Sequence, residues 1–245
     1  MDVSTERQLI VFDFDWSLAD QDSDRWIFEV LAPDLRRKMK NLKEEIQWTD
    51  LVAQSLRELH GRGGTREDIE GALKIMPFHP AMKRAVLKAK AKANPKSTFL
   101  CLSNANSVFI STILKERGLE TLFDEIITNP AEWDESGLLK LRRRVDPSGP
   151  QHNCLIGCSP NMCKGEELDA FIAKQQTAFD RIIYIGDGSN DFCPILRLRS
   201  QDIVFCRSYR GLQKRITKEG ESAGLQAQVY YWAGAWEAEE LFSKF

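Results

Sequence analysis

Short apolar segments that end at polar residues recur along the chain and predict strands buried on both faces. The first begins at Gln8 and continues to Phe12, after which carboxylates appear. Similar segments lie at residues 98–102, 181–186 and 203–206, with weaker ones at 125–128 and 228–231. Continuous apolar runs of this kind are typical of parallel sheets, whereas a half-exposed strand alternates between apolar and polar residues.

Segments with helical spacing of apolar residues separate several of these predicted strands. Residues 107–116 and 164–175 are two examples. Strands that alternate with helices indicate βαβ units with right-handed crossovers. The fold class predicted is therefore α/β, with a doubly wound, Rossmann-like and mostly parallel sheet.

Residues 18–95 interrupt this alternation. They show no convincing strand pattern, and apolar residues such as Ile46, Leu51 and Leu56 recur at helical spacing. Thr65 and Asp68 have the spacing of a capping box that opens a helix. We therefore expect an α/β core at residues 1–17 and 96–245, with a helical cap inserted at 18–95.

A second irregular region covers residues 128–145. Its turn-forming residues at 134–137 predict a hairpin, with a basic strand at Arg142–Arg144. Those three arginines could bind an anionic partner, or they could simply form a solvated face of the hairpin.

Composition narrows the class of protein without identifying it. The 245 residues are 42% hydrophobic, which is enough for a packed core, and 34 Lys and Arg nearly balance 36 Asp and Glu. A net charge of -2 gives no reason to expect nucleic-acid or membrane binding. No apolar run approaches the roughly 20 residues of a membrane span, and the N-terminus is polar. We expect a soluble cytoplasmic protein, whose oligomeric state the sequence leaves open.

Carboxylates follow two of the predicted strands. Asp13 and Asp15 come directly after the first, and Asp187 and Asp191 follow the strand at 181–186. Open α/β sheets bind ligands outside the carboxyl ends of their strands. Alone, the first pair could be a helix cap and a surface residue, and the second could belong to a turn. Two acidic clusters at two strand ends favour a ligand-binding site over these structural roles, and their hard oxygen ligands suit Mg²⁺.

A hydroxyl and an ammonium occupy two further positions at predicted element ends. Ser103 follows the strand at 98–102, and Lys164 opens a helix. Together they could hold a phosphoryl group and neutralise its developing charge. Each is weak evidence alone, because a serine after a strand is usually a helix cap.

The order of these motifs resembles the haloacid dehalogenase-like phosphohydrolase superfamily. Asp13-Phe-Asp-Trp-Ser17, Ser103, Lys164 and Gly186-Asp-Gly-Ser-Asn-Asp191 stand where that superfamily has its four motifs. A closer resemblance covers nearly the whole chain, through segments such as 20–24, 103–106, 158–165 and 186–194. It points to the phosphoethanolamine/phosphocholine phosphatase family, which includes pyridoxal-phosphate phosphatases and members associated with thiamine monophosphate.

The resemblance implies a Mg²⁺-dependent phosphatase that acts through an aspartyl-phosphate. Asp13 would be the nucleophile and Asp15 the general acid and base, while Mg²⁺ would bind Asp13, the Asp15 carbonyl and Asp187. The other implied roles are phosphate binding by Ser103, Asn104 and Lys164, orientation by Asn190 and Asp191, and substrate specificity through Asp20, Ser23, Asp24 and Trp16.

The substrate implied is a small phosphomonoester: phosphocholine, phosphoethanolamine, pyridoxal phosphate or thiamine monophosphate. Asn104 stands where close relatives often have aspartate, which removes one counter-charge for an amine. A quaternary ammonium could instead use an aromatic wall such as Trp16 or Trp26. Two alternatives remain: a phosphotransferase or phosphomutase with the same covalent chemistry, and a non-catalytic binding protein.

Cysteines raise a separate question. His152, Cys154, Cys158 and Cys163 lie close together in the chain, but their spacing matches no standard zinc motif. Reduced thiols and a structural metal both remain open from the sequence.

Overall fold

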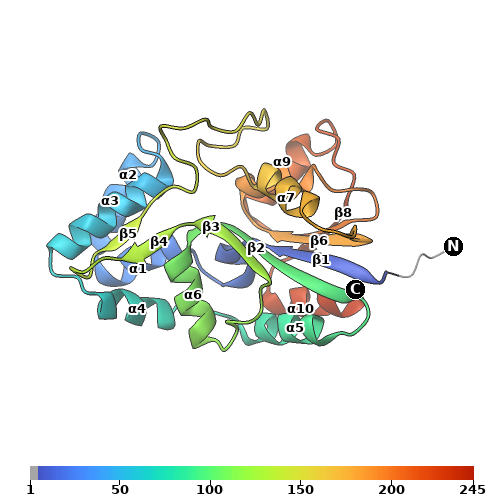
Figure 1. Cartoon of the computed structure of the whole chain (residues 1–245), viewed down its shortest axis with the longest axis horizontal. Coiled ribbons are helices and arrows are strands. Elements are labelled where there is room, and N and C mark those ends of the chain that lie inside the picture. The colour runs from blue at the N-terminus through green and yellow to red at the C-terminus, as the bar shows by residue number, and fades with distance from the viewer. Residues whose placement is uncertain (1–4) are drawn as a thin grey trace.

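The structure is a computed structural model that describes residues 5–245, so residues 1–4 of the polar N-terminal stretch lie outside the described residues. In the described chain, six parallel strands form one sheet in the order β3-β2-β1-β6-β7-β8 (Figure 1). The predicted parallel α/β sheet is confirmed. The strands are β1 (Arg7–Phe12), β2 (Lys96–Asn106), β3 (Glu125–Asn129), β6 (Arg181–Gly186), β7 (Ile203–Arg207) and β8 (Gln228–Trp232).

Helices cover both faces of this sheet. One face carries α5 (Pro80–Ala91), α6 (Ser107–Glu116) and α10 (Ala235–Lys244), and the other carries α7 (Lys164–Ala173) and α9 (Gly211–Glu219) (Figure 1). The short helix α8 (Phe192–Ile195) packs against α7 in the core of the second face. Ile10 and Phe12 of β1 pack into the first core, whereas Leu9 and Val11 pack into the second. Because successive side chains of a strand point to opposite faces, burial on both sides requires the continuous apolar run.

The insertion between β1 and β2 is helical. It contains α1 (Ser23–Leu31), α2 (Pro33–Leu42), α3 (Trp48–Gly61), α4 (Arg66–Lys74) and α5. Thr65 and Asp68 form the predicted capping box at the start of α4. Helix α5 packs against α10 and β2 on the sheet, so α1–α4 are the part that lies beyond the carboxyl ends of the strands (Figure 1).

The predicted hairpin is present, but its basic strand is not. Strands β4 (Ala131–Trp133) and β5 (Leu139–Leu141) pair antiparallel, and β5 ends before the arginines. Arg143 then forms an ion pair with Asp50 of α3, and Arg144 pairs with Glu167 of α7. Because both guanidinium groups have carboxylate partners on neighbouring helices, the chain leaves the hairpin at this point rather than extending it.

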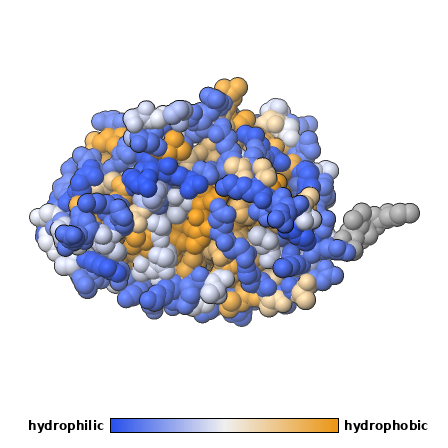
Figure 2. Space-filling view, viewed as in Figure 1, coloured by the Kyte–Doolittle hydropathy of each residue, from blue (hydrophilic) through white to orange (hydrophobic). Residues whose placement is uncertain are grey.

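Apolar side chains are concentrated in the interior of the molecule. Hydrophilic side chains cover most of the face in Figure 2, and the exposed large apolar residues, such as Ile75, Leu155 and Tyr209, belong to separate segments. Among the described helices, none combines the length and the apolar character that crossing a membrane requires.

Candidate active site

The two acidic clusters meet between β1 and β6, where the order of the strands in the sheet reverses. From β1 the chain winds outward through β2 and β3, whereas β6 pairs with the other side of β1 and leads to β7 and β8. Asp13 follows β1, and its backbone N–H donates to the carbonyl of Ile185 in β6 at 2.9 Å. Asp187 follows β6. Such a switch point leaves a crevice outside the strand ends, where ligands of this fold class bind.

Lys164 joins the two clusters. Its side chain is 1% exposed at the start of α7, and Nζ lies 2.9 Å from Asp13 Oδ1 and 2.7 Å from Asp191 Oδ1. Asp191 also accepts a 2.7 Å hydrogen bond from the Tyr184 hydroxyl and backbone N–H bonds from residues 187 and 188. A Cβ at Gly186 would stand 2.7 Å from Asp191 Cγ, so this close approach requires glycine.

Burial leaves the carboxylates short of compensating charge. Burial, followed by the charge of Asp191, raises the pKa of Asp13 to about 7 although Lys164 opposes the shift. Burial and the charges of Asp13 and Asp191 raise the pKa of Asp187 to about 8. Burial disfavours the ammonium of Lys164, but Asp13 and Asp191 outweigh it and raise its pKa. Three carboxylates and one ammonium leave two negative charges, which one divalent cation would balance.

Asp15 lies in the wide turn at Phe14–Leu18, directly after the nucleophile candidate. The backbone N–H and the hydroxyl of Ser23 donate to its two oxygens at 3.0 and 3.1 Å. Desolvation by burial, then the charges of Asp22 and Asp24, raise the pKa of Asp15 well above its ordinary value. The environment therefore favours the protonated form that a general acid needs.

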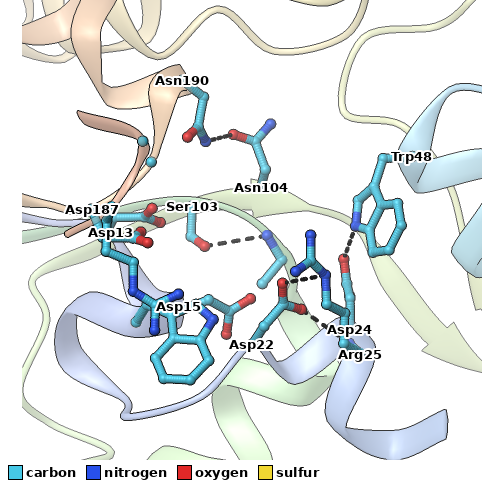
Figure 3. Close-up of a pocket in the computed structure, with 15 residues that line it drawn as sticks. Asp13, Asp15, Asp22, Asp24, Arg25, Trp48, Ser103, Asn104, Asp187 and Asn190 are labelled. Carbon is cyan, nitrogen blue, oxygen red and sulfur yellow. Dashed lines mark hydrogen bonds and ion pairs between the residues drawn. The ribbon is translucent and has the colours of Figure 1, made fainter. Parts of the chain in front are cut away.

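A cavity of about 340 Å³ opens in front of these groups (Figure 3). Asp13 and Asp187 lie at one end, and Asp24 of α1 and Trp48 of α3 lie at the other. Its lining residues are Asp13, Asp15, Trp16, Asp22, Asp24, Arg25, Trp48, Ser103, Asn104, Ala105, Asp187, Gly188, Asn190, Arg210 and Gly211.

At the far end of the cavity the side chain of Asp24 is buried, and one of its carboxylate oxygens is enclosed by protein. Trp48 Nε1 donates to Asp24 Oδ2 at 2.9 Å, whereas Asp24 Oδ1 has no hydrogen-bond partner among the described residues. Burial, followed by the charge of Asp22, raises the pKa of Asp24 to about 7. Asp22 itself is paired with Arg25 at 3.0 Å. Asp24 is thus a second acidic group of this wall, and the neighbouring Arg25, which is paired with Asp22, offsets only part of its charge.

Polar residues in the last part of β2, which extends past the predicted strand end at 102 to Asn106, and residues after β6 form the remaining wall. Ser103 is 1% exposed, and its hydroxyl oxygen accepts a 3.2 Å hydrogen bond from the Ala105 N–H, which leaves its proton to be donated. Asn190 Nδ2 donates to Asn104 Oδ1 at 2.9 Å (Figure 3). Both asparagines line the cavity.

Three residues considered for substrate contact lie elsewhere. Asp20 forms an ion pair with Arg207 and does not line the cavity. Ser23 holds Asp15, as described above, and also lies outside the lining. Trp26 donates from its indole to the carbonyl of Ala72 at 2.7 Å, between α1 and α4.

Trp16 does line the cavity, and its backbone adopts a φ of 59°, in the left-handed region. The Arg210 guanidinium carbon lies 3.6 Å from the centroid of its ring. A cation therefore already occupies one face of this indole. Arg210, Arg25 and Trp48 were not singled out from the sequence, because no local motif marks them.

A buried polar network fixes the start of α3. Thr49 Oγ1 accepts from Asn161 Nδ2 at 3.2 Å and from Asn129 Nδ2 at 3.4 Å, and Asn161 also donates to Asn129 Oδ1 at 2.8 Å. The ion pair between Asp50 and Arg143 lies next to it. These contacts join the helical insertion to the segments that follow β3 and precede α7.

The donor set of Asp13, Asp187 and Asp191 suits a hard divalent cation, since one carboxylate oxygen from each lies within 4.8 Å of the others. Both oxygens of Asp191 already accept hydrogen bonds, from Lys164 and Tyr184 and from two backbone N–H groups. Asp13 and Asp187 are therefore the carboxylates with capacity for a metal.

Comparison with known proteins identifies similar sequences over almost the whole chain. A model of the family described as "Putative Phosphatase" matches residues 8–245. A thiamine phosphate phosphatase-like protein of Arabidopsis thaliana is 34% identical over 95% of this chain and 93% of its own length. A pyridoxal phosphate phosphatase of Bos taurus is 32% identical over 94% of both chains. Inorganic pyrophosphatase 1 of Arabidopsis thaliana is 37% identical over 80% of this chain, and the match spans 65% of that relative.

Solved structures agree on the fold. The crystal structure of phosphoserine phosphatase from T. onnurineus superimposes with a TM-score of 0.59 at 15% sequence identity, covering 100% of this chain and 98% of that one. The doubly wound sheet with its helical insertion is thus a haloacid dehalogenase-like fold.

Proposed function

The chain belongs to the putative phosphatase family, and from that membership we propose that it hydrolyses small phosphomonoesters through an aspartyl-phosphate on Asp13. The arrangement that supports this chemistry is the contact between Lys164 and Asp13 at the mouth of a cavity that also contains Asp15. A carboxylate nucleophile, an adjacent acid and a buried ammonium are the parts that phosphoryl transfer to a protein side chain needs.

The covalent step uses the free oxygen of Asp13. Lys164 and the N–H of Phe14 both contact Oδ1, which leaves Oδ2 to attack phosphorus. As this bond forms, the bond between phosphorus and the alcohol oxygen breaks, and Asp15 gives its proton to the leaving oxygen. Asp15 then removes a proton from a water molecule that attacks the aspartyl-phosphate, releasing phosphate and restoring Asp13.

The remaining polar groups have roles in binding and orientation. Ser103 and Asn104 donate to phosphate oxygens, and Lys164 neutralises their charge. Asp191 orients Lys164, and Asn190 orients Asn104 through their 2.9 Å hydrogen bond.

Mg²⁺ fits the charge that the site leaves uncompensated. The carboxylates of Asp13 and Asp187, with the backbone carbonyl of Asp15, would hold it. When bound, Mg²⁺ supplies a Lewis acid that withdraws charge from phosphate oxygens. Repulsion between Asp13 and a phosphate dianion falls accordingly.

We place the leaving alcohol against the helical insertion, residues 18–95, which serves as a cap. Its α1 and α3 supply Asp24 and Trp48, opposite Asp13 (Figure 3). The buried carboxylate of Asp24, which forms no ion pair of its own among the described residues, is the observation that selects the substrate class, because a buried carboxylate gains most from a cation. A phosphomonoester whose alcohol carries a positive nitrogen meets that need: phosphocholine, phosphoethanolamine, thiamine monophosphate or pyridoxal phosphate.

The test compares phosphocholine with 3,3-dimethylbutyl phosphate, its uncharged isostere. The kcat/KM for phosphocholine should be about 10- to 100-fold higher than that for the uncharged isostere. This is the factor that one hydrogen bond or contact involving a charge contributes to binding. Asp24→Asn keeps the acceptor for Trp48 but removes the charge, and should make the two substrates equal. Asp34→Asn, which affects an exposed carboxylate of α2, is the matched control and should preserve the preference. Equal turnover of both substrates by the unaltered protein contradicts the proposal for Asp24.

Inorganic pyrophosphate is a second candidate. Arg25 and Arg210 line the cavity, and the similar Arabidopsis protein bears the name inorganic pyrophosphatase. Arg210→Gln should lower pyrophosphate hydrolysis selectively if the second phosphate binds there. We expect pyrophosphate to be the poorer substrate, since Asp22 and Asp24 stand in the same wall. Phosphate release without any added acceptor separates hydrolysis from the phosphotransferase alternative.

A further inference from the structure

A cluster of thiols lies behind the active site, on the side of the sheet covered by α7 and α8. Cys154, Cys158 and Cys163 come from the segment before α7, and Cys193 comes from α8. One sulfur atom from each lies within 4.8 Å of the other three. Three of them lie near His152 in the sequence, but Cys193 is 30 residues further along than Cys163, and no local spacing marks it.

The distances within the cluster match a tetrahedral metal site. Cys154 Sγ lies 3.6 Å from Cys158 and 3.4 Å from Cys193, and Cys163 Sγ lies 3.7 Å from Cys158 and 3.6 Å from Cys193. A Zn–S bond of about 2.3 Å places the sulfur atoms of a tetrahedron about 3.8 Å apart. A disulfide would require about 2.05 Å, and none of the six cysteines forms one.

The surroundings leave room for the sulfur atoms and place hydrogen-bond donors and a cation beside them. A Cβ at Gly165 would stand 2.6 Å from Cys193 Sγ, so the absence of a side chain there makes space for the cluster. The N–H of Ile156 donates to Cys154 Sγ at 3.4 Å, and Cys163 is the N-cap of α7. The Arg197 guanidinium lies beside Cys193. Backbone N–H groups, a helix N-terminus and a cation all stabilise thiolates.

His152 is not part of this arrangement. Its Nε2 lies 2.9 Å from the carbonyl oxygen of Ser159, and the four thiols complete a coordination shell without it. Four cysteine ligands are the usual shell of a structural zinc, which keeps no open position for a substrate.

We propose that Cys154, Cys158, Cys163 and Cys193 bind one zinc ion as a structural site. Soft thiolates select zinc, whereas the hard carboxylates of Asp13 and Asp187 select magnesium. The chain would then carry two cations of different chemistry, one on each side of Lys164.

The position of the zinc site gives it a role in holding the lysine. Cys163 directly precedes Lys164, and Cys193 lies two residues after Asp191, which accepts the hydrogen bond from Lys164. One ion bound to both segments ties the start of α7 to α8. Zinc is therefore a positioning element for Lys164 and takes no part in the reaction itself.

The first experiment measures metal in the full-length reduced protein. Elemental analysis after gel filtration should find one zinc per chain. A mercurial reagent that blocks thiols should release that zinc to a colorimetric chelator, in proportion to four modified cysteines. Cobalt(II) that replaces it should show the intense visible absorption of a tetrahedral thiolate site. This experiment needs no variant, so it does not depend on a substituted chain folding.

Variants then identify the ligands. Cys154→Ser and Cys158→Ser, both at partly exposed positions, should lose the bound zinc and unfold at a lower temperature than the parent. Cys206→Ser is the matched control, because this buried cysteine belongs to β7 and lies outside the cluster, and it should retain one zinc. If zinc positions Lys164, the two ligand variants should lower kcat more than they raise KM.

Several results would overturn the proposal. Protein purified without zinc that also fails to bind added zinc when reduced would do so. Iron in place of zinc would refute the identity of the metal, and a disulfide among the four cysteines in the purified protein would refute the site. Full zinc content in Cys154→Ser and Cys158→Ser would show that these residues are not the ligands. All of these results are separate from the phosphatase assay, so the proposed function stands or falls independently.

Discussion

Magnesium binding should weaken steeply as the pH falls from 8 to 6. The carboxyls of Asp13 and Asp187 have pKa values raised to about 7 and about 8 in the protein without metal, chiefly by burial, with the charge of Asp191 adding to both and that of Asp13 adding to the pKa of Asp187. A divalent cation that binds both needs them ionised. It must therefore displace the protons that they carry.

The size of the change in Mg²⁺ affinity follows from those two pKa values, which are treated as belonging to the pair of carboxyls. Above pH 8 both carboxyls are ionised, and the affinity should be nearly constant. Between pH 8 and 7 one proton is displaced, and below pH 7 two are displaced. From pH 8 to pH 6 the affinity should fall by about 500-fold, which corresponds to about 4 kcal/mol.

Without the metal, the stability of the folded protein should change with pH in the opposite direction to the Mg²⁺ affinity. The pKa of each carboxyl is higher in the folded protein than the ordinary value of 3.8, so between about pH 4 and pH 8 the folded state holds more protons than the unfolded state. The free energy of unfolding of the metal-free protein must then decrease as the pH rises through this window. Added Mg²⁺ should raise the unfolding temperature more at pH 8 than at pH 6.

Calorimetric titration with Mg²⁺ at several pH values, in buffers of different ionisation enthalpy, measures both the affinity and the protons released. Asp134→Asn is the control, because the hydrogen bond from Ser136 and other contacts in the hairpin lower the pKa of this unburied carboxyl to about 2. That variant should reproduce the parent curve. An Mg²⁺ affinity that is equal at pH 6 and pH 8 would contradict this prediction, since it would mean that no carboxyl with a raised pKa has to ionise for the metal to bind.

Three other substitutions or treatments test separate parts of the site. Asp13→Asn should abolish phosphate release while circular dichroism shows an unchanged fold, and turnover at the parent rate would exclude the aspartyl-phosphate. Excess EDTA should stop the reaction and Mg²⁺ should restore it, so full activity in EDTA would exclude the metal. Lys164→Met should lower the free energy of unfolding by about 3–5 kcal/mol, because it leaves two buried carboxylates without their cation. Denaturant unfolding measures that loss, and a change below about 1 kcal/mol would show that the pair is compensated by other groups.

The positions of residues that come at the end of an apolar strand segment were predictable from the sequence. Asp13, Ser103 and Asp187 each follow a segment whose apolar pattern defines a buried strand, and parallel strands end at one edge of a sheet. The meeting of Lys164 with Asp13 came from the family resemblance. No periodicity connects residues that lie so far apart in the chain.

Residues whose positions depend on contacts between separate segments of the chain were not predictable in the same way. Ser23 was expected at the substrate, but the path of the chain after β1 turns it toward Asp15. Asp20 finds its partner in Arg207, which is 187 residues further along. Cys193 joins the thiol cluster through the packing of α8 against α7. Each of these contacts depends on tertiary packing, which local patterns do not encode.

The Thr49 network determines how the cavity admits its substrate. Trp48 is the neighbour of Thr49 in the chain, so the hydrogen bonds from Asn129 and Asn161 hold the indole against the part of the molecule that carries the sheet. The width of the cavity is then set before a substrate arrives. Under the proposed function, a leaving group larger than the space between Trp48 and Asp13 would collide with this wall, and a smaller residue at position 48 should widen the range of substrates.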